Sequence, residues 1–193
     1  MHAGGQRIFL IRHGETEWSA AGRHTGRTDM PLTNAGKRDA ERLGSVLAGL
    51  SFDAFTSPLQ RAKETAGLAG FPAARIDDDL CEWDYGVYEG RTTLDIRKET
   101  PEWSVWLSPI TGGESLEDVA TRANRVIARI LETATGDVGL FAHGHFLRIF
   151  AACWMEMPPL AGRRLGLDTA TISILGYERQ TRVIRRWNVG TTL

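Results

Sequence analysis

The stretch IFLIRHG, residues 8–14, decides the fold of this chain. Four consecutive apolar residues end at a charged pair and a glycine, which is typical of a short strand buried on both faces. The segment VGLFA, residues 138–142, repeats the pattern and is followed by His143 and Gly144. The two runs predict two buried strands of one parallel sheet, each followed directly by a histidine or an arginine-histidine pair.

The segment between these two runs alternates between predicted helices and strands. Thr33 is a predicted N-cap, and apolar residues follow it at helical spacing up to Leu50. A strand is expected over 52–56, and the Ser57-Pro58 pair after it predicts a helix that runs to about Ala69. A third strand is expected over 74–76. Residues 84–114, rich in Gly, Pro and Trp, indicate an irregular and partly helical excursion.

The second half of the chain continues the alternation. A capping box over 115–118 opens a helix with an apolar stripe that continues to Leu131. A short apolar helix is expected to follow the segment 143–145 and to run to Trp154, and a hairpin is expected over 171–176 and 181–187. Alternating strands and helices predict an α/β fold with a mainly parallel sheet, and we expect one domain over 1–193.

Composition excludes several classes of protein. The chain has 193 residues, of which 42% are hydrophobic, and its 23 basic and 24 acidic residues nearly cancel. This balance argues against a nucleic-acid or membrane partner, and no stretch approaches the roughly 18 apolar residues of a membrane span. Cys81 and Cys153 suit neither a disulfide framework nor a metal motif, so we expect reduced thiols and a cytoplasmic protein without metal. The sequence leaves open whether the chain forms a homo-oligomer.

Three distant segments each place reactive residues just beyond a predicted strand. They are His13, the segment from Ser57 to Arg61, and His143. Ligands bind at this carboxyl edge in open α/β sheets, so we expect these groups around one crevice. A neutral histidine can attack phosphorus, and Arg12 offers a planar fork for phosphate oxygens. Taken singly, Arg61 is better interpreted as a solvated helix residue and His143 as a helix cap, whereas a surface Arg-His pair is the lesser alternative for Arg12 and His13.

A carboxylate is also needed to protonate a departing alkoxide. The segment CEWDYGVYEG, residues 81–90, offers Glu82, Asp84 and Glu89, and the sequence alone does not choose among them. The acidic residues 77–79 are interpreted as a solvated turn, because no histidine or spaced carboxylate completes a metal site.

These motifs together resemble the histidine phosphatase superfamily, also called phosphoglycerate-mutase-like. The run RHGETEW at 12–18 is its hallmark, and the likeness continues through TGRTD at 25–29, TSPLQRAKET at 56–65, the segment 82–90, GGES at 112–115 and His143-Gly144. The resemblance implies a three-layer α/β/α sandwich. It also implies that His13 is the nucleophile, that Glu82 is the general acid, and that the phosphate pocket contains Arg12, Arg61 and His143.

The resemblance implies further pocket residues. Ser19, Thr25 and Gly26 match loop positions that touch phosphate or substrate, although Ser19 replaces a common asparagine. Gly144 joins the phosphate pocket, and His145 and His24 are weaker candidates, since His145 could equally cap a helix. The aromatic residues Trp83, Tyr85, Trp103 and Trp106 could wall the pocket, but we expect at least two of them in the core.

The chain looks most similar to a branch of small phosphatases that includes sedoheptulose bisphosphatase of fungi and acid phosphatases of actinobacteria. The related mutases carry an inserted basic segment with adjacent arginines, whereas residues 91–111 contain only Arg91, Arg97 and Lys98 as bases. We therefore expect hydrolysis of small phosphate monoesters, with sugar phosphates as the expected substrates and with no cofactor. The alternatives are phosphoglycerate mutase-type transfer and an inactive sensor of phosphorylated ligands.

Overall fold

A six-stranded sheet forms the centre of the computed structural model, which describes residues 5–190. The strands lie in the order β3-β2-β4-β1-β5-β6. β1 and β2 each pair in parallel with β4, and β2 with β3, whereas β5 is antiparallel to both β1 and β6. The strand bounds are β1 Ile8–Arg12, β2 Asp53–Thr56, β3 Arg75–Ile76, β4 Val138–Ala142, β5 Ile172–Glu178 and β6 Thr181–Val189.

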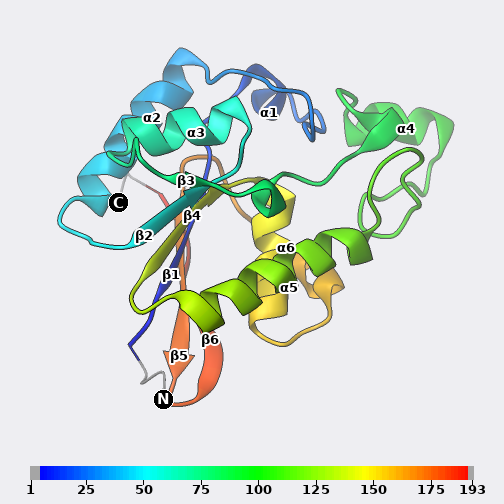
Figure 1. Cartoon of the computed structure of the whole chain (residues 1–193). Coiled ribbons are helices and arrows are strands. Elements are labelled where there is room, and N and C mark those ends of the chain that lie inside the picture. The colour runs from blue at the N-terminus through cyan, green and yellow to red at the C-terminus, as the bar shows by residue number, and fades with distance from the viewer. Residues whose placement is uncertain (1–4, 191–193) are drawn as a thin grey trace.

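Helices cover both faces of this sheet. Figure 1 shows α2 and α3 on one face and α5 and α6 on the other, so the expected three-layer α/β/α sandwich is confirmed. The helices are α1 Glu17–Ala20, α2 Asn34–Leu47, α3 Gln60–Leu68, α4 Thr93–Glu99, α5 Leu116–Thr133 and α6 Gly144–Trp154, with short 3-10 turns η1 Asp78–Leu80, η2 Gly86–Tyr88 and η3 Pro159–Arg164. Within residues 5–190, none of these helices has the length and apolar character that crossing a membrane requires.

The continuous apolar run of β1 follows from its central place in the sheet. Ile8 and Leu10 pack into the core beneath α5 and α6, whereas Phe9 and Ile11 pack into the core beneath α2 and α3. All four side chains are buried. A strand with helices on both faces has no solvent-facing side, so every position is apolar.

Two of the three predicted N-caps, Thr33 and Ser115, are confirmed. The Thr33 side chain accepts a hydrogen bond from the Gly36 amide at 3.0 Å, and Ser115 forms the expected capping box with Asp118. The predicted start of α3 is wrong, because the helix begins at Gln60 with Leu59 as its N-cap. The physical reason is that the Ser57 hydroxyl lies 2.8 Å from a ring nitrogen of His143. Its oxygen also accepts from the Leu59 amide at 3.3 Å, so Ser57 orders the turn before α3 while it contacts His143.

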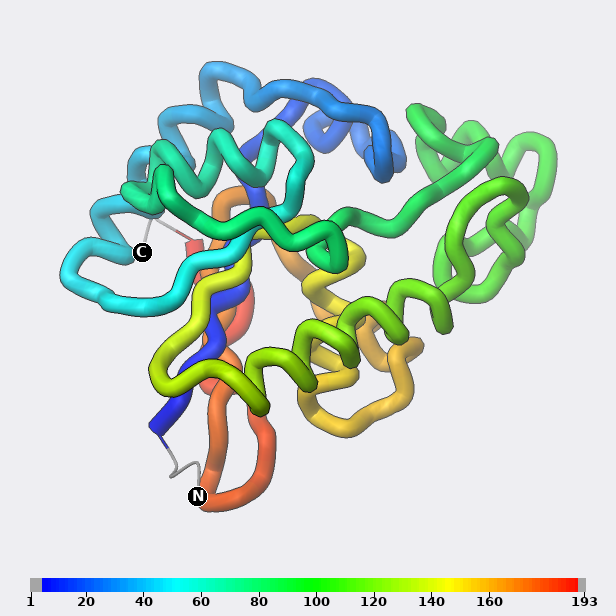
Figure 2. The backbone as a smooth tube through the Cα atoms, in the orientation of Figure 1, coloured from blue at the N-terminus to red at the C-terminus, as the bar shows by residue number. Residues whose placement is uncertain are grey.

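The excursion over 84–114 lies beside the sheet, where Figure 2 shows it in green, and contains η2 and α4. Trp83, Tyr85 and Trp103 are at most 2% exposed, which confirms the expectation that at least two of the aromatic residues belong to the core. Cys81 and Cys153 are buried and unpaired.

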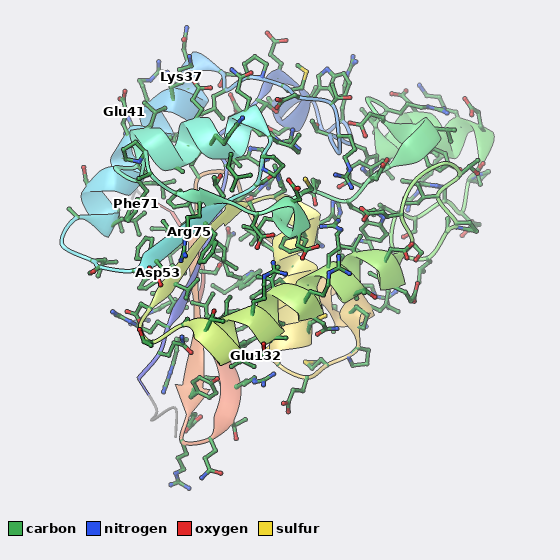
Figure 3. The ribbon with its side chains drawn as sticks, in the orientation of Figure 1. Lys37, Glu41, Asp53, Phe71, Arg75 and Glu132 are labelled. Atoms are coloured by element: carbon green, nitrogen blue, oxygen red, sulfur yellow. The ribbon has the colours of Figure 1, made fainter. Side chains whose placement is uncertain are left out.

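Charged residues line the β3 edge of the sheet. Figure 3 shows Asp53 and Arg75 near each other there, and their side chains lie 3.6 Å apart. In the acidic cluster that follows β3, Asp79 pairs with Arg125 and Arg129 of α5. The cluster therefore ties the sheet edge to α5.

Candidate active site

The register of β1 and β4 brings the two conspicuous histidines together. Arg12 pairs with Ala142 across the two parallel strands, so His13 and His143 follow at the same edge of the sheet. Their ring centroids are 5.2 Å apart. Ser57 follows β2 on the other side of β4 and lies next to His143. The fold therefore brings the three distant segments together at one edge of the sheet, as predicted.

His13 is held as a neutral imidazole. Its Nδ1 lies 2.7 Å from the Gly14 carbonyl oxygen, which can only accept, so Nδ1 carries the hydrogen and Nε2 keeps its lone pair. Burial, followed by the charges of Arg61 and Arg12, lowers the pKa of His13 well below its ordinary value. The ring is therefore uncharged at neutral pH and has one nitrogen available as a nucleophile.

Gly14 is required by close packing. A Cβ atom at this position would lie 2.5 Å from the carbonyl oxygen of Gly36 at the start of α2. The Gly14 amide also donates to the Thr65 hydroxyl of α3 at 3.0 Å. The glycine after His13 thus lets α2 and α3 pack directly against the turn that carries the nucleophile.

Arg61 lies behind His13, fully buried in the first turn of α3. Its Nε donates to His143 Nδ1 at 3.1 Å, and its two Nη atoms donate to the carbonyl oxygens of Thr28, Thr25 and Gly26 at 2.9–3.1 Å. A guanidinium has five N–H groups, so these four bonds leave one Nη1 hydrogen for a ligand. Arg61 is at once a positive charge beside His13 and the anchor of the 25–28 loop.

Both ring nitrogens of His143 contact protein groups. Because Nδ1 accepts from Arg61, Nε2 carries the hydrogen and donates to Ser57 Oγ at 2.8 Å. Burial, together with the charge of Arg61, lowers the pKa of His143 well below its ordinary value. His143 is thus a neutral link that orients Arg61.

A cavity of about 180 Å³ opens at this edge. Most of the predicted site residues line it, whereas Arg61, His143 and Gly26 lie behind its wall. The predicted residues in the lining are Arg12, His13, Ser19, His24, Thr25, Glu82, Gly144 and His145.

Glu82 is the carboxylate that reaches this cavity. Its Oε2 accepts from the His145 amide at 3.0 Å, and its Oε1 accepts from the amides of Phe146 and Trp83 at 2.8 and 3.0 Å. The competing carboxylates face elsewhere: Asp84 accepts from the Gly86 amide and Glu89 from the Gly26 amide. Of the three carboxylates that the sequence left as alternatives, Glu82 is therefore the one that reaches the cavity. It also caps the first turn of α6.

The loop residues engage in local hydrogen bonds. The Ser19 hydroxyl donates to the Thr16 carbonyl oxygen at 3.0 Å and accepts from the Thr16 amide, so it completes the capping box of α1. The Thr25 hydroxyl donates to the Arg23 carbonyl oxygen. The amide of Gly26 donates to Glu89 and its carbonyl accepts from Arg61, so this residue shapes the loop from behind the cavity.

Two further histidines, His145 and His24, line the same cavity. His145 Nδ1 lies 2.7 Å from the Tyr85 hydroxyl, and burial lowers the pKa of His145 well below its ordinary value. His24 Nε2 lies 3.2 Å from the Thr93 hydroxyl, and burial lowers the pKa of His24 to about 4. Both rings are neutral hydrogen-bonding groups near neutral pH.

Sequence reasoning missed the ion pair between the buried Arg122 and the half-buried Glu114, which holds the chain around Glu82 in place. Arg122 Nη1 donates to the carbonyl oxygens of Asp79 and Cys81, and its Nε and Nη2 each lie 2.8 Å from the Glu114 carboxylate. Glu114 in turn accepts from the Asp84 amide at 3.0 Å. The available signal was a cation within the apolar spacing of α5, where Val119 and Val126 flank it.

The described residues, 5–190, contain no group of three or more His, Cys, Asp or Glu side chains arranged to hold a metal ion. The fold and the site together define the class of α/β enzymes that act on phosphate esters through a histidine. The chain belongs to the histidine phosphatase superfamily (branch 1), whose family model matches residues 8–190.

Individual relatives agree with this family. The chain is 42% identical to an acid phosphatase of Mycobacterium tuberculosis over 180 residues, which cover 91% of this chain and 89% of the relative. It is 38% identical to the sedoheptulose 1,7-bisphosphatase of Saccharomyces cerevisiae, with 78% and 68% of the two chains covered. The solved structure of a Mycobacterium tuberculosis open reading frame product superposes with a TM-score of 0.92 at 40% identity, over 96% of this chain and 98% of that one.

Proposed function

We propose that this protein is a phosphoric monoester hydrolase that cleaves small phosphate esters, sugar phosphates among them, through a phosphohistidine on His13. The observation that carries the proposal is the neutral, buried imidazole of His13, which lines one cavity with Arg12 and Glu82 and has Arg61 directly behind it. This set supplies a nucleophile, positive charge for the phosphate oxygens and a carboxyl group for proton transfer.

In the first half-reaction, the Nε2 lone pair of His13 attacks phosphorus in line with the ester oxygen. The P–N bond forms as the P–O bond to the alcohol breaks, and Glu82 gives its proton to the departing oxygen. Arg12 and the remaining Nη1 hydrogen of Arg61 stabilise the phosphoryl oxygens.

In the second half-reaction, the Glu82 carboxylate takes a proton from water as the water oxygen attacks phosphorus. The P–N bond breaks, the electron pair returns to His13 Nε2, and inorganic phosphate leaves. Positioning and electrostatics supply most of the rate in phosphoryl transfer. Loss of one preorganised donor such as Arg12 is therefore expected to cost on the order of 10²-fold in rate.

The bases of the excursion favour hydrolysis over the mutase alternative. Arg91 pairs with Glu99 at 2.6 Å, and Lys98 pairs with Asp95 at 2.6 Å. Arg97 donates to the Trp103 carbonyl oxygen. None of these three cations lines the cavity, so they provide no second set of charges to retain a phosphorylated intermediate product.

The test is release of inorganic phosphate across a panel of metabolite phosphates, with His13→Ala as the control. Release of free phosphate by the wild type but not by His13→Ala supports the proposal. Incubation with phosphoglycerates separates the rival reaction, because a mutase returns an isomerised ester. Failure to trap labelled phosphate on the wild-type chain, after a quench that avoids acid, would overturn the phosphohistidine.

We also propose a cytoplasmic location. The unpaired thiols of Cys81 and Cys153 favour it, because disulfides accumulate in oxidising compartments. Fractionation of the native cells tests this location.

A further inference from the structure

The segment 165–171, which links η3 to β5, supports the turn that carries the nucleophile. The Leu167 carbonyl oxygen accepts a hydrogen bond from Arg12 Nη1 at 2.5 Å. The Ala170 amide donates to the His13 carbonyl oxygen at 3.0 Å. The segment therefore holds the guanidinium of Arg12 and the backbone of His13 together.

The Arg12 guanidinium is anchored through Nη1 and packs closely against the start of α6. A Cβ atom on Gly144 would lie 3.3 Å from its Cζ and Nε atoms. Its Nε is buried and, within residues 5–190, has no hydrogen-bond partner. Because the guanidinium is planar and Leu167 holds Nη1, the position of the Leu167 carbonyl also sets the direction of the Nε hydrogen.

Two consecutive residues of β6 hold the segment on either side of Leu167. Trp187 Nε1 donates to the Gly166 carbonyl oxygen at 2.5 Å. The Asn188 side chain forms two hydrogen bonds with Asp168, each 2.8 Å long. Its Oδ1 accepts from the Asp168 amide, and its Nδ2 donates to the Asp168 carboxylate. The carbonyl that anchors the guanidinium thus lies between two residues that β6 holds.

A β-bulge allows neighbouring side chains of β6 to contact the same segment. In a regular strand, consecutive side chains point to opposite faces of the sheet. The pairing of β5 with β6 shifts register between Ile172 and Ile174, so Trp187 and Asn188 both oppose Ser173. Asn188 has a φ of 54°, a left-handed conformation that asparagine adopts more readily than most residues. Its amide donates to Ser173 Oγ at 2.9 Å, which holds the bulge in place.

We propose that Asn188 and Asp168 are positioning residues, whose paired hydrogen bonds hold the Leu167 carbonyl where it directs the Arg12 guanidinium toward the phosphoryl oxygens. This inference rests on the proposed function, which assigns Arg12 to the transferred phosphate. Neither Asn188 nor Asp168 lines the cavity, so the pair acts through Arg12. Small displacements of a positioned group matter in catalysis, since a shift of about 1 Å can cost about 10²-fold in rate.

The test exchanges the two side chains. Asn188→Asp loses the Nδ2 hydrogen bond and places a second carboxylate against that of Asp168. The double variant Asp168→Asn/Asn188→Asp puts the amide at 168 and the carboxylate at 188, so both hydrogen bonds can form again. We expect Asn188→Asp to lower kcat/KM by on the order of 10-fold, and the exchange to restore it. The loss should be equal for alkyl and aryl phosphates, because Arg12 acts on the phosphoryl group and not on the leaving group.

Binding of orthovanadate, an analogue of phosphate, gives a second measurement that does not depend on turnover. Titration calorimetry should show about 10-fold weaker binding to Asn188→Asp than to wild type, and recovery in the double variant. Asp168→Asn alone should lose less than Asn188→Asp, because an amide oxygen at 168 can still accept from Asn188 Nδ2. If Asn188→Asp does not fold, Asn188→Gly replaces it, since glycine tolerates the positive φ and removes the side chain without adding charge.

Asn124→Asp is the matched control, because it makes the same chemical change at an exposed position of α5. It should change neither kcat/KM nor vanadate affinity. A lower melting temperature of Asn188→Asp with unchanged vanadate affinity would assign the pair a structural role and overturn the inference. A double variant as impaired as Asn188→Asp, or an equal loss in Asp168→Asn, would overturn it as well. A wild type that binds vanadate but releases no phosphate from any ester would instead overturn the proposed function, and the vanadate affinities would still test the pair.

Discussion

At the scale of single residues, the buried histidines link the site to pH. His24 has a pKa of about 4 in the folded chain, against about 6.5 for an unfolded histidine. Below pH 6.5 the unfolded chain therefore binds a proton that the folded chain does not, and stability falls with falling pH until the folded pKa is reached. Above pH 6.5 both states are neutral at this residue.

We expect His24 alone to lower the free energy of unfolding by about 2 kcal/mol between pH 7 and pH 5. Urea unfolding of wild type and His24→Gln at both pH values measures this. The variant should lose less stability than wild type over the interval. Parallel losses in the two proteins would show that His24 titrates normally.

Glu82 gives a second prediction at this scale. Glu82→Gln cannot donate an acidic proton, so we expect hydrolysis of an alkyl phosphate to fall by about 10²- to 10⁴-fold. An activated aryl phosphate, whose leaving group needs no proton, should lose far less. Steady-state rates on the two substrates, with the melting temperature as a folding control, check this. Equal losses of rate on the alkyl and the aryl phosphate would show that Glu82 does not transfer the proton.

At the scale of elements, α5 holds the Glu82 segment in place through Arg122. Within the described part of the chain, removal of this guanidinium leaves the half-buried carboxylate of Glu114 with Arg27, 4.0 Å away, as its one remaining cation, so we expect Arg122→Gln to lose about 3 kcal/mol of stability. The alkyl-to-aryl phosphate ratio should shift in the same direction as in Glu82→Gln, because the carboxyl group loses its position. Urea unfolding and rates on both substrates measure the two effects.

Arg125→Gln is the matched control, because this arginine lies three residues further along α5 on its exposed side, where it pairs with Asp79. It should change neither the rate ratio nor, to any large extent, the stability, because an exposed ion pair contributes little. A similar shift in both variants would mean that α5 as a whole, and not Arg122, positions the segment.

The same scale shows what the sequence could predict. The apolar runs of β1 and β4 and the capping box of α5 depend on neighbours in the chain, so local patterns sufficed. The start of α3 depends on the contact between Ser57 and His143, which are 86 residues apart. The hydrogen bonds from Arg122 to the Glu82 segment join residues that are about 40 positions apart. Likewise, Arg61 was predictable as a site residue, but its bonds to the 25–28 loop were not, because carbonyl oxygens carry no sequence signal.

At the scale of the whole molecule, the chemistry is assigned entirely to protein groups. Exhaustive dialysis against a chelator should therefore leave kcat/KM unchanged, and added Mg²⁺ or Zn²⁺ should not raise it. Metal content measured on the dialysed protein serves as the control for complete removal. Loss of activity on dialysis that a metal ion restores would contradict the two half-reactions as written.

The hydrogen bonds that Glu82 accepts from the start of α6 have a practical consequence. A glutamine at this position would turn an N–H group toward backbone N–H groups, so the variant loses helix anchorage along with its proton donor. For trapping an intact substrate in a crystal, His13→Ala is the better starting point. The hydrogen bond it gives up is only to the neighbouring carbonyl, and the helix end at the mouth of the cavity keeps its shape.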